Sequence, residues 1–195
     1  MPPVTGALLG ANVLVFLLQL AGGLPLVEHF ALWPPAAGPR PGPGFELWQL
    51  VTYSFLHGSM LHILVNMLAL YTFGRDIERL FGSRWYLQYY FVCVVTAALS
   101  HLVVTAWMGG PPVPTVGASG GVFGLLLAYG IYFPRRTVIL LFPPIPLPAR
   151  VFVVLFGALE LYFGVTGTAS GVAHFAHLGG MLGGWLMIRA RRRRR

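Results

Sequence analysis

The sequence predicts an all-α polytopic membrane protein: a bundle of six transmembrane helices with a re-entrant or interfacial first loop. Of its 195 residues, 56% are hydrophobic and only 9% are charged, whereas a soluble domain usually carries about 25% charged residues. The apolar residues gather into stretches near the ~20 residues that a helix needs to cross a bilayer. We expect residues 1–190 to form a single transmembrane domain and residues 191–195 to form a basic cytoplasmic tail.

Hydropathy and the flanking charges place the spans and orient them. Arginines fall in the loops after the second and fourth spans and at the C-terminus, whereas the loops on the opposite side hold only Arg40. Cytoplasmic loops carry the excess of positive charge, so both termini are predicted to be cytoplasmic. The predicted spans are residues 5–22, 55–74, 85–108, 118–134, 148–166 and 171–189.

The first loop, residues 23–50, is long and rich in proline. Such a loop is either disordered or an element that lies on the membrane surface. Phe45, Leu47 and Trp48 near its end favour the second interpretation, because aromatic and apolar side chains settle at the bilayer interface.

The net charge of +8 comes without a single lysine, and six of the 13 arginines stand at Arg189 and residues 191–195. A basic run beside an apolar helix is typical of a topology anchor that touches anionic lipid. We therefore expect the lipid bilayer, and no nucleic acid, as a partner. The single cysteine, Cys93, lies in an apolar stretch and has no internal disulfide partner, so a small buried side chain is expected.

The fourth span is short and begins with the polar residue Ser119, in the stretch GASG at 117–120. From Ser119 to Phe133 is only ~22 Å of helix, so its N-terminus must start below the membrane surface. Unpaired N–H groups there require a wet, protein-lined cavity, and they suit a developing oxyanion. An isolated serine more often bonds between helices, but its neighbours here favour a catalytic role.

Counting from the nearest cytoplasmic arginines places three polar side chains at one depth. At ~1.5 Å per residue, Ser119 lies ~24 Å above Arg135. By the same measure His177 lies ~18 Å above Arg189, and His62 lies ~20 Å above its own arginine. Three separate spans are thus predicted to bring these residues together in the outer half of the membrane.

Glycines four residues apart predict close contact between spans four and six, and hence a serine–histidine pair. Such spacing lets helix backbones approach, which would bring Ser119 within reach of His177. Histidine, with an unperturbed pKa near 6.5, can take the serine proton. His174, one turn earlier, is a competing base. Glu160 is the only intramembrane acid and is not expected at this depth, so a dyad is favoured over a triad. The glycine pairs are Gly120 with Gly124, Gly180 with Gly184, and Gly179 with Gly183.

The second span carries hydrogen-bond donors on one face, since His62 and Asn66 are four residues apart. An imidazole and an amide aimed at the serine would stabilise a tetrahedral intermediate, although an asparagine in a span also commonly joins helices. His57 is expected to line the water-filled cavity, and His101 to be a satisfied structural residue. No metal is predicted, because no cysteine or carboxylate cluster joins the histidines, and no other cofactor is implied.

These residues resemble the rhomboid family of intramembrane serine proteases over roughly residues 45–186. The second span reads H-x4-H-x3-N from His57, residues 117–120 read G-x-S-G, and residues 176–184 read A-H-x-x-G-x3-G. The resemblance implies the six-span bacterial form, in an inner (plasma) membrane. It also makes Gly117, Gly120, Gly180 and Gly184 motif glycines.

The resemblance further implies a role for each site residue. Ser119 would be the nucleophile and His177, not His174, the base, with His62, Asn66 and the Ser119 N–H as the oxyanion site. Glu78 looks like the family's structural acid. Two positions depart from the family pattern: Gln49 replaces the usual arginine of a Trp-Arg pair, and Phe123 replaces a tyrosine found in some members.

The predicted function is therefore hydrolysis of peptide bonds in or near transmembrane helices, by a serine endopeptidase that uses a Ser119–His177 dyad. The partners are transmembrane protein substrates whose helices unwind easily, since a stable helix hides its carbonyls. The alternatives are a catalytically inactive membrane chaperone or a transporter with a histidine relay. The sequence carries no signal of oligomeric state.

Overall fold

The computed structural model describes residues 1–22, 25–35, 43–108, 113–140, 143–168 and 172–193. The predicted all-α character is confirmed, with one small antiparallel pair of strands as the exception. In chain order the elements are α1 (Pro3–Ala21), α2 (Leu26–Phe30), α3 (Gln49–Thr52), the 3-10 helix η1 (Tyr53–Phe55), α4 (Met60–Phe81), α5 (Ser83–Met108), α6 (Ser119–Tyr132), β1 (Thr137–Ile139), β2 (Pro146–Pro148), α7 (Ala149–Thr166) and α8 (His174–Arg193).

Several of the helices suit a membrane. Within the described residues, α1, α5 and α7 are each long and apolar enough to cross a bilayer. A fourth span forms if residues 49–55 and α4, joined at a bend of 100°, count together. Helix α6 has only 14 residues and α8 ends in arginines. The chain is thus an all-α polytopic protein, and the count of six spans stays a prediction.

The boundaries of the second and sixth spans differ from those predicted. The sequence predicts span two at residues 55–74, but α4 begins at Met60, where the Ser59 side chain caps it, and ends at Phe81, before Gly82 with φ 80°. The arginines assigned to the following loop lie in α4 and in the first turn of α5, because long arginine side chains reach the surface from inside a helix. Likewise α8 continues to Arg193, so the basic tail is helical up to that residue, and residues 194–195 lie outside the described part.

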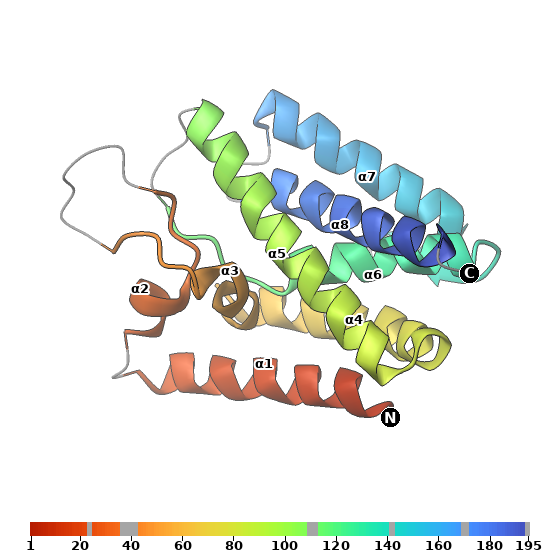
Figure 1. Cartoon of the computed structure of the whole chain (residues 1–195), viewed down its shortest axis with the longest axis horizontal. Coiled ribbons are helices and arrows are strands. Elements are labelled where there is room, and N and C mark those ends of the chain that lie inside the picture. The colour runs from red at the N-terminus through yellow and green to blue at the C-terminus, as the bar shows by residue number, and fades with distance from the viewer. Residues whose placement is uncertain (23–24, 36–42, 109–112, 141–142, 169–171, 194–195) are drawn as a thin grey trace.

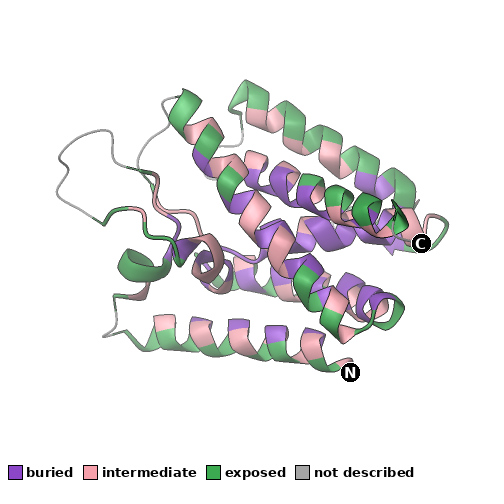
Figure 2. Ribbon diagram, viewed as in Figure 1, coloured by how far each residue is buried: buried purple, intermediate pink, exposed green. Residues whose placement is uncertain are grey.

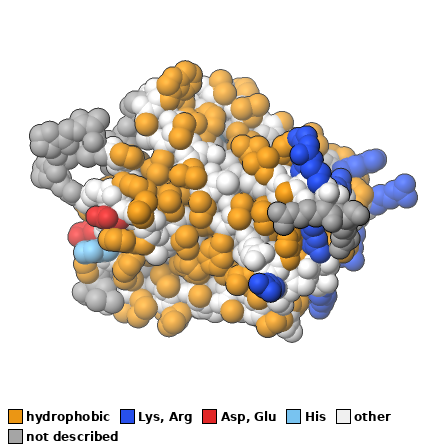
Figure 3. Space-filling model, viewed as in Figure 1, with side chains coloured by type: hydrophobic (Ala, Val, Ile, Leu, Met, Phe, Trp, Pro, Cys, Tyr) orange, Lys and Arg blue, Asp and Glu red, His pale blue; other side chains and the backbone are white. Residues whose placement is uncertain are grey.

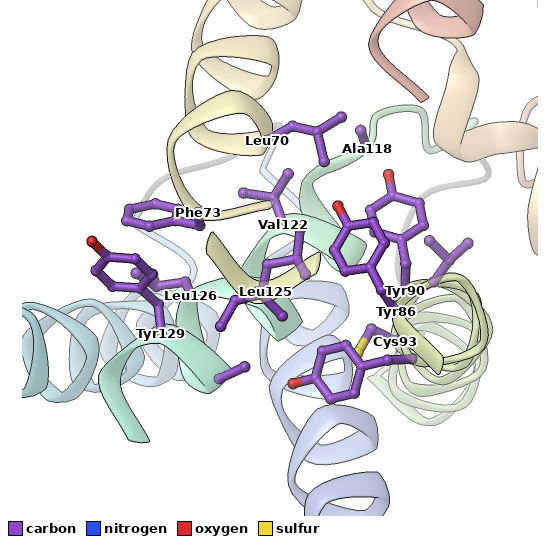
Figure 4. Close-up of a cluster of buried hydrophobic side chains, with 14 of the residues drawn as sticks. Leu70, Phe73, Tyr86, Tyr90, Cys93, Ala118, Val122, Leu125, Leu126 and Tyr129 are labelled. Atoms are coloured by element: carbon purple, nitrogen blue, oxygen red, sulfur yellow. The ribbon is translucent and has the colours of Figure 1, made fainter. Parts of the chain in front are cut away.

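The helices surround α6, which lies at the centre of the bundle in contact with α4, α5, α7 and α8, while α1 flanks α4 (Figure 1). Both termini lie at the same end of the molecule, and the arginines gather there (Figures 1 and 3). Burial is greatest on the faces that meet α6 (Figure 2). Leu125 of α6 and Ala118, the residue before α6, are wholly buried, and they pack with Tyr90 and Cys93 of α5 (Figure 4).

The outer surface is apolar, as expected of a protein in lipid. Large hydrophobic side chains on α1, α4 and α7 point outward, among them Leu14, Leu64 and Val154. Hydrophobic side chains cover most of the face seen in Figure 3. Because a soluble monomer exposes only small apolar patches, this surface fits contact with lipid chains.

Glycines bring α6 and α8 into direct backbone contact, as predicted. A Cβ added at Gly180 would strike the backbone of Gly120, and one at Gly124 would lie 3.2 Å from the Gly180 carbonyl oxygen. Gly184, however, faces Tyr89 and Cys93 of α5 rather than α6. Gly179 and Gly183 also face α5, so α8 lies against two helices on two glycine faces.

Glu78 ties three helices together near the end where the termini lie. Its buried carboxylate accepts hydrogen bonds from the backbone N–H groups of Val4 and Thr5 at 3.0 and 2.7 Å, and from the Thr5 hydroxyl at 2.7 Å. The Ser83 hydroxyl donates at 2.7 Å to Oε1, the oxygen that also accepts from Val4. A carboxylate at a helix N-terminus satisfies otherwise unpaired N–H groups, so the structural role implied for Glu78 has a physical basis.

Gln49 anchors the first loop by hydrogen bonds. It occupies the position that is usually an arginine in the family that the sequence resembles. Its buried side chain donates to the carbonyls of His29 and Gly44 at 3.3 and 3.2 Å, and accepts from the Trp33 N–H at 3.2 Å. The loop therefore keeps a polar anchor without the arginine. Residues 23–24 and 36–42, which include Arg40, lie outside the described part of this loop.

Candidate active site

Ser119 is the first residue of α6, and the preceding glycine aims it. Gly117 has φ 128°, a conformation that strongly favours glycine, and its N–H donates to the Tyr53 carbonyl at 2.9 Å. The first backbone bond inside α6 runs from Val122 N–H to the Ala118 carbonyl at 3.1 Å. The N–H groups before Val122 therefore have no partner within the helix and point out of its N-terminus. The segment 113–118 before α6 is not helical, as expected, and residues 109–112 lie outside the described part.

The structure brings Ser119 and His177 into contact. His177 Nε2 lies 2.8 Å from Ser119 Oγ, so the predicted convergence of spans four and six is confirmed as a geometric fact. The imidazole is buried, and it stacks on the Phe123 ring with centroids 4.2 Å apart and planes 5° apart. A phenyl ring thus supports the imidazole at a position where some members of the family that the sequence resembles carry a tyrosine.

Glu160 reaches the same histidine from α7. Its Oε2 lies 2.9 Å from His177 Nδ1 and 2.6 Å from His174 Nδ1. The expectation that no acid lies at this depth is therefore wrong. The sequence did contain a signal, because Glu160 lies ten residues beyond Arg150, which is ~15 Å above the cytoplasmic face against ~18 Å for His177.

The cluster also bears on the prediction of no metal. The ligand atoms of Glu160, His174 and His177 lie within 4.8 Å of one another, the spacing of a group that could hold an ion. The premise that no carboxylate joins the histidines is wrong. His174 Nδ1 makes a hydrogen-bond contact with Glu160 Oε2, whereas His177 Nδ1 lies 2.9 Å from the same oxygen without an aligned hydrogen bond. The absence of a metal stays a prediction.

His62 faces the serine across Gly117. Its Nδ1 accepts from the Gly58 N–H at 3.3 Å, so in the neutral ring Nε2 carries the hydrogen. A Cβ at Gly117 would lie 2.8 Å from His62 Nε2 and 3.7 Å from Ser119 Oγ. The Nε2–H group is therefore available beside the nucleophile.

Asn66 and His57 contact His62. The Asn66 amide donates to the His62 carbonyl at 2.9 Å within α4. The buried His57 ring meets the His62 ring edge-on, with centroids 5.0 Å apart. Gln19 of α1 holds the His57 backbone at 3.0 and 3.2 Å. His57 and Asn66 thus support His62, and a direct role for Asn66 stays a prediction.

His101 is a satisfied structural residue, as expected. Its Nε2 lies 2.8 Å from the Thr115 hydroxyl. The backbone of Thr115 pairs with Leu32 of the first loop, at 2.9 and 3.0 Å. This bridge joins the segment before Ser119 to α5 and to the first loop, and so limits where the N-terminus of α6 can lie.

Comparison with known proteins finds a matching family and several similar relatives. The model of the Rhomboid domain matches residues 44–194. The chain is 28% identical over 192 residues to rhomboid protease GluP of Bacillus subtilis, covering 97% of this chain and 35% of that protein. It is 32% identical over 183 residues to rhomboid protease GlpG of Klebsiella pneumoniae, covering 88% and 61% respectively.

A plant relative is also similar. RHOMBOID-like protein 4 of Arabidopsis thaliana is 35% identical over 153 residues, which cover 74% of this chain and 34% of that protein. The chain thus spans less than two thirds of the length of each of these relatives. The matched part includes every residue of the candidate active site.

Proposed function

Because this chain belongs to the rhomboid family, we propose that it is an intramembrane serine endopeptidase. The observation that carries the proposal is the 2.8 Å contact between Ser119 Oγ and His177 Nε2, on helices that are surrounded by apolar spans. A serine hydroxyl is a weak nucleophile until a base takes its proton. The contact supplies that base in a bundle with an outward-facing apolar surface.

The proposed reaction is acyl transfer through a covalent intermediate. Ser119 Oγ attacks the carbonyl carbon of the scissile peptide bond while His177 Nε2 takes the hydroxyl proton. The imidazolium then returns this proton to the leaving amine, and the acyl-enzyme forms. Water then attacks the ester while His177 takes its proton, and the imidazolium returns that proton to Ser119 Oγ as the ester bond breaks and the second product leaves.

The oxyanion of the tetrahedral intermediate would lie between two sets of donors. One set is the N–H groups at the N-terminus of α6, which have no helical partner. The other is the Nε2–H of His62, held in that tautomer by the Gly58 N–H. Donors fixed in a site with little water stabilise developing charge more than they would in bulk solvent.

The proposed substrates are transmembrane proteins that present an unwound segment. An intact helix keeps its carbonyls in hydrogen bonds, so local unwinding must precede attack. The arginines gathered at the end where the termini lie (Figure 3) support an orientation with both termini in the cytoplasm. The relatives in bacteria support an inner (plasma) membrane as the location.

The test is cleavage of a transmembrane reporter by the purified protein in liposomes. The parent chain should cleave, and Ser119→Ala and His177→Ala should reduce the rate to background. Ser100→Ala is the matched control, since Ser100 lies on α5 against Gly179 and outside the site. Client binding without cleavage in the parent would instead support a chaperone, and loss of transport in His177→Ala alone would support a histidine relay.

A further inference from the structure

We propose that Glu160 is a positioning residue that orients His177 and stabilises the positive charge that this histidine acquires during catalysis. The inference rests on the proposed function, because it assigns a part in the same reaction. The observation is that three helices bring Ser119 Oγ, the His177 ring and Glu160 Oε2 together, with separations of 2.8 and 2.9 Å on the two sides of the ring.

The tautomer of His177 is the first consequence. A carboxylate offers only acceptors, so the nitrogen that faces it carries the hydrogen. Nδ1–H toward Glu160 leaves Nε2 with a free lone pair toward Ser119, which is the form that a general base needs. The opposite tautomer would present a hydrogen to the serine hydroxyl and could take no proton from it.

Charge is the second consequence. When Nε2 takes the proton from Ser119, the imidazole becomes a cation in a buried site, where an unpaired charge is costly. The side chain of Glu160 is only 12% exposed, and it lies within ion-pair distance of the ring. Glu160 keeps its charge and Nδ1 keeps its proton throughout, so the only proton that moves is the one shared by Ser119 and His177.

His174 holds the carboxylate in place. Its Nδ1 contacts the same Oε2 at 2.6 Å, and its ring lies against Phe163 of α7. The Nδ1–H of His177 is not aligned with Oε2, so this contact is chiefly one of charge, and the better hydrogen bond goes to His174. His174 therefore contacts Glu160 and not Ser119. It does not act as the competing base that its position one turn before His177 suggests.

The poor alignment between His177 Nδ1–H and Glu160 Oε2 sets how large a loss of kcat we expect. Replacing a well-aligned triad acid by its amide lowers the turnover of chymotrypsin-type proteases by about 10⁴-fold. Here alignment is poorer, while Phe123 also holds the ring. We expect Glu160→Gln to lower kcat by about 10- to 100-fold, an intermediate loss, because charge is removed while stacking still orients the ring.

Glu160→Gln is the sharpest variant, because glutamine matches glutamate in size and can still accept a hydrogen bond from either histidine. If Glu160 only joined α7 to α8, Gln would preserve most of that contact. The test therefore measures kcat and KM for reporter cleavage in liposomes, together with the rate at which a fluorophosphonate labels Ser119. Thermal unfolding of each variant checks the fold.

The expected result is a fall in kcat and in the labelling rate of about 10- to 100-fold, with KM within about threefold of the parent. Glu160→Asp should recover part of this loss, since it restores the charge. Thr166→Val is the control on the same helix: its exposed hydroxyl bonds to the Tyr162 carbonyl, and its activity should match the parent.

A folded Glu160→Gln protein with parental kcat and labelling rate would overturn the inference. Equal losses of activity in Glu160→Gln and Glu160→Asp, accompanied by equal losses of thermal stability, would also overturn it. The labelling rate separates this failure from failure of the proposed function. A parent that labels at Ser119 but does not cleave still tests Glu160 through labelling. A parent that neither labels nor cleaves would overturn both proposals.

Discussion

Gly117→Ala tests how closely the site depends on the turn before α6. Gly117 has φ 128°, and a Cβ there would lie 2.8 Å from both Cε1 and Nε2 of His62. Backbone strain for a side chain in such a conformation costs about 1–3 kcal/mol. The imidazole must also move, because real Cβ atoms do not approach ring atoms so closely.

The displaced His62 should impair catalysis beyond the effect on stability. Loss of one oxyanion donor costs about 10²- to 10³-fold in turnover in serine proteases. The Gly58 N–H limits how far the ring can rotate, so we expect kcat to fall by about 100-fold, at the lower end of that range, with little change in KM.

Two other glycines make matched controls. Gly82 has φ 80° and no atom within 4 Å of an added Cβ, so Gly82→Ala isolates backbone strain. Gly10 has neither a positive φ nor a neighbour within 4 Å, so Gly10→Ala should be close to neutral. Thermal unfolding and reporter cleavage in liposomes would be measured for all three variants.

Comparing the three variants separates the effect of backbone strain from the effect of displacing His62. We expect Gly82→Ala to lose stability alone and Gly117→Ala to lose stability and turnover. A folded Gly117→Ala protein with parental kcat would refute the reasoning that His62 serves the oxyanion from its observed place.

Two further predictions concern helix packing and the carboxylate that caps α1. Gly180→Ala should destabilise the fold by more than about 2 kcal/mol in thermal unfolding, because its Cβ would strike the backbone of α6; near-neutrality would mean that α6 and α8 do not touch there. Glu78→Gln should lower stability by about 1–3 kcal/mol, because hydrogen bonds to a buried carboxylate are weakened, and the exposed Glu46→Gln should not.

The helices and the height of the site could be predicted from the sequence, because helical rise is constant and arginines mark one membrane face. That reasoning placed Ser119 and His177 at one level, and they lie in contact. It placed the end of the second span too early. The charge pattern predicts that Arg75 and Arg79 lie in a loop, although a long side chain can reach the surface from within α4.

Direction around a helix axis was harder to predict than height. The same arginine ruler puts Glu160 within ~3 Å of the level of His177, yet nothing in the sequence says which face of α7 turns inward. The glycine pairs have the same weakness. They predict that a neighbour approaches, but Gly184 meets Tyr89 of α5 and not α6. Which helix lies beside which is decided by the packing of the whole bundle.

The most direct test of the account is to map the site of a fluorophosphonate adduct by mass spectrometry. The parent protein and His177→Ala would be labelled side by side in liposomes. The account predicts a single adduct on Ser119 in the parent and none in His177→Ala. An adduct on another serine, or equal labelling of Ser119 without His177, would contradict the claim that this contact creates the nucleophile.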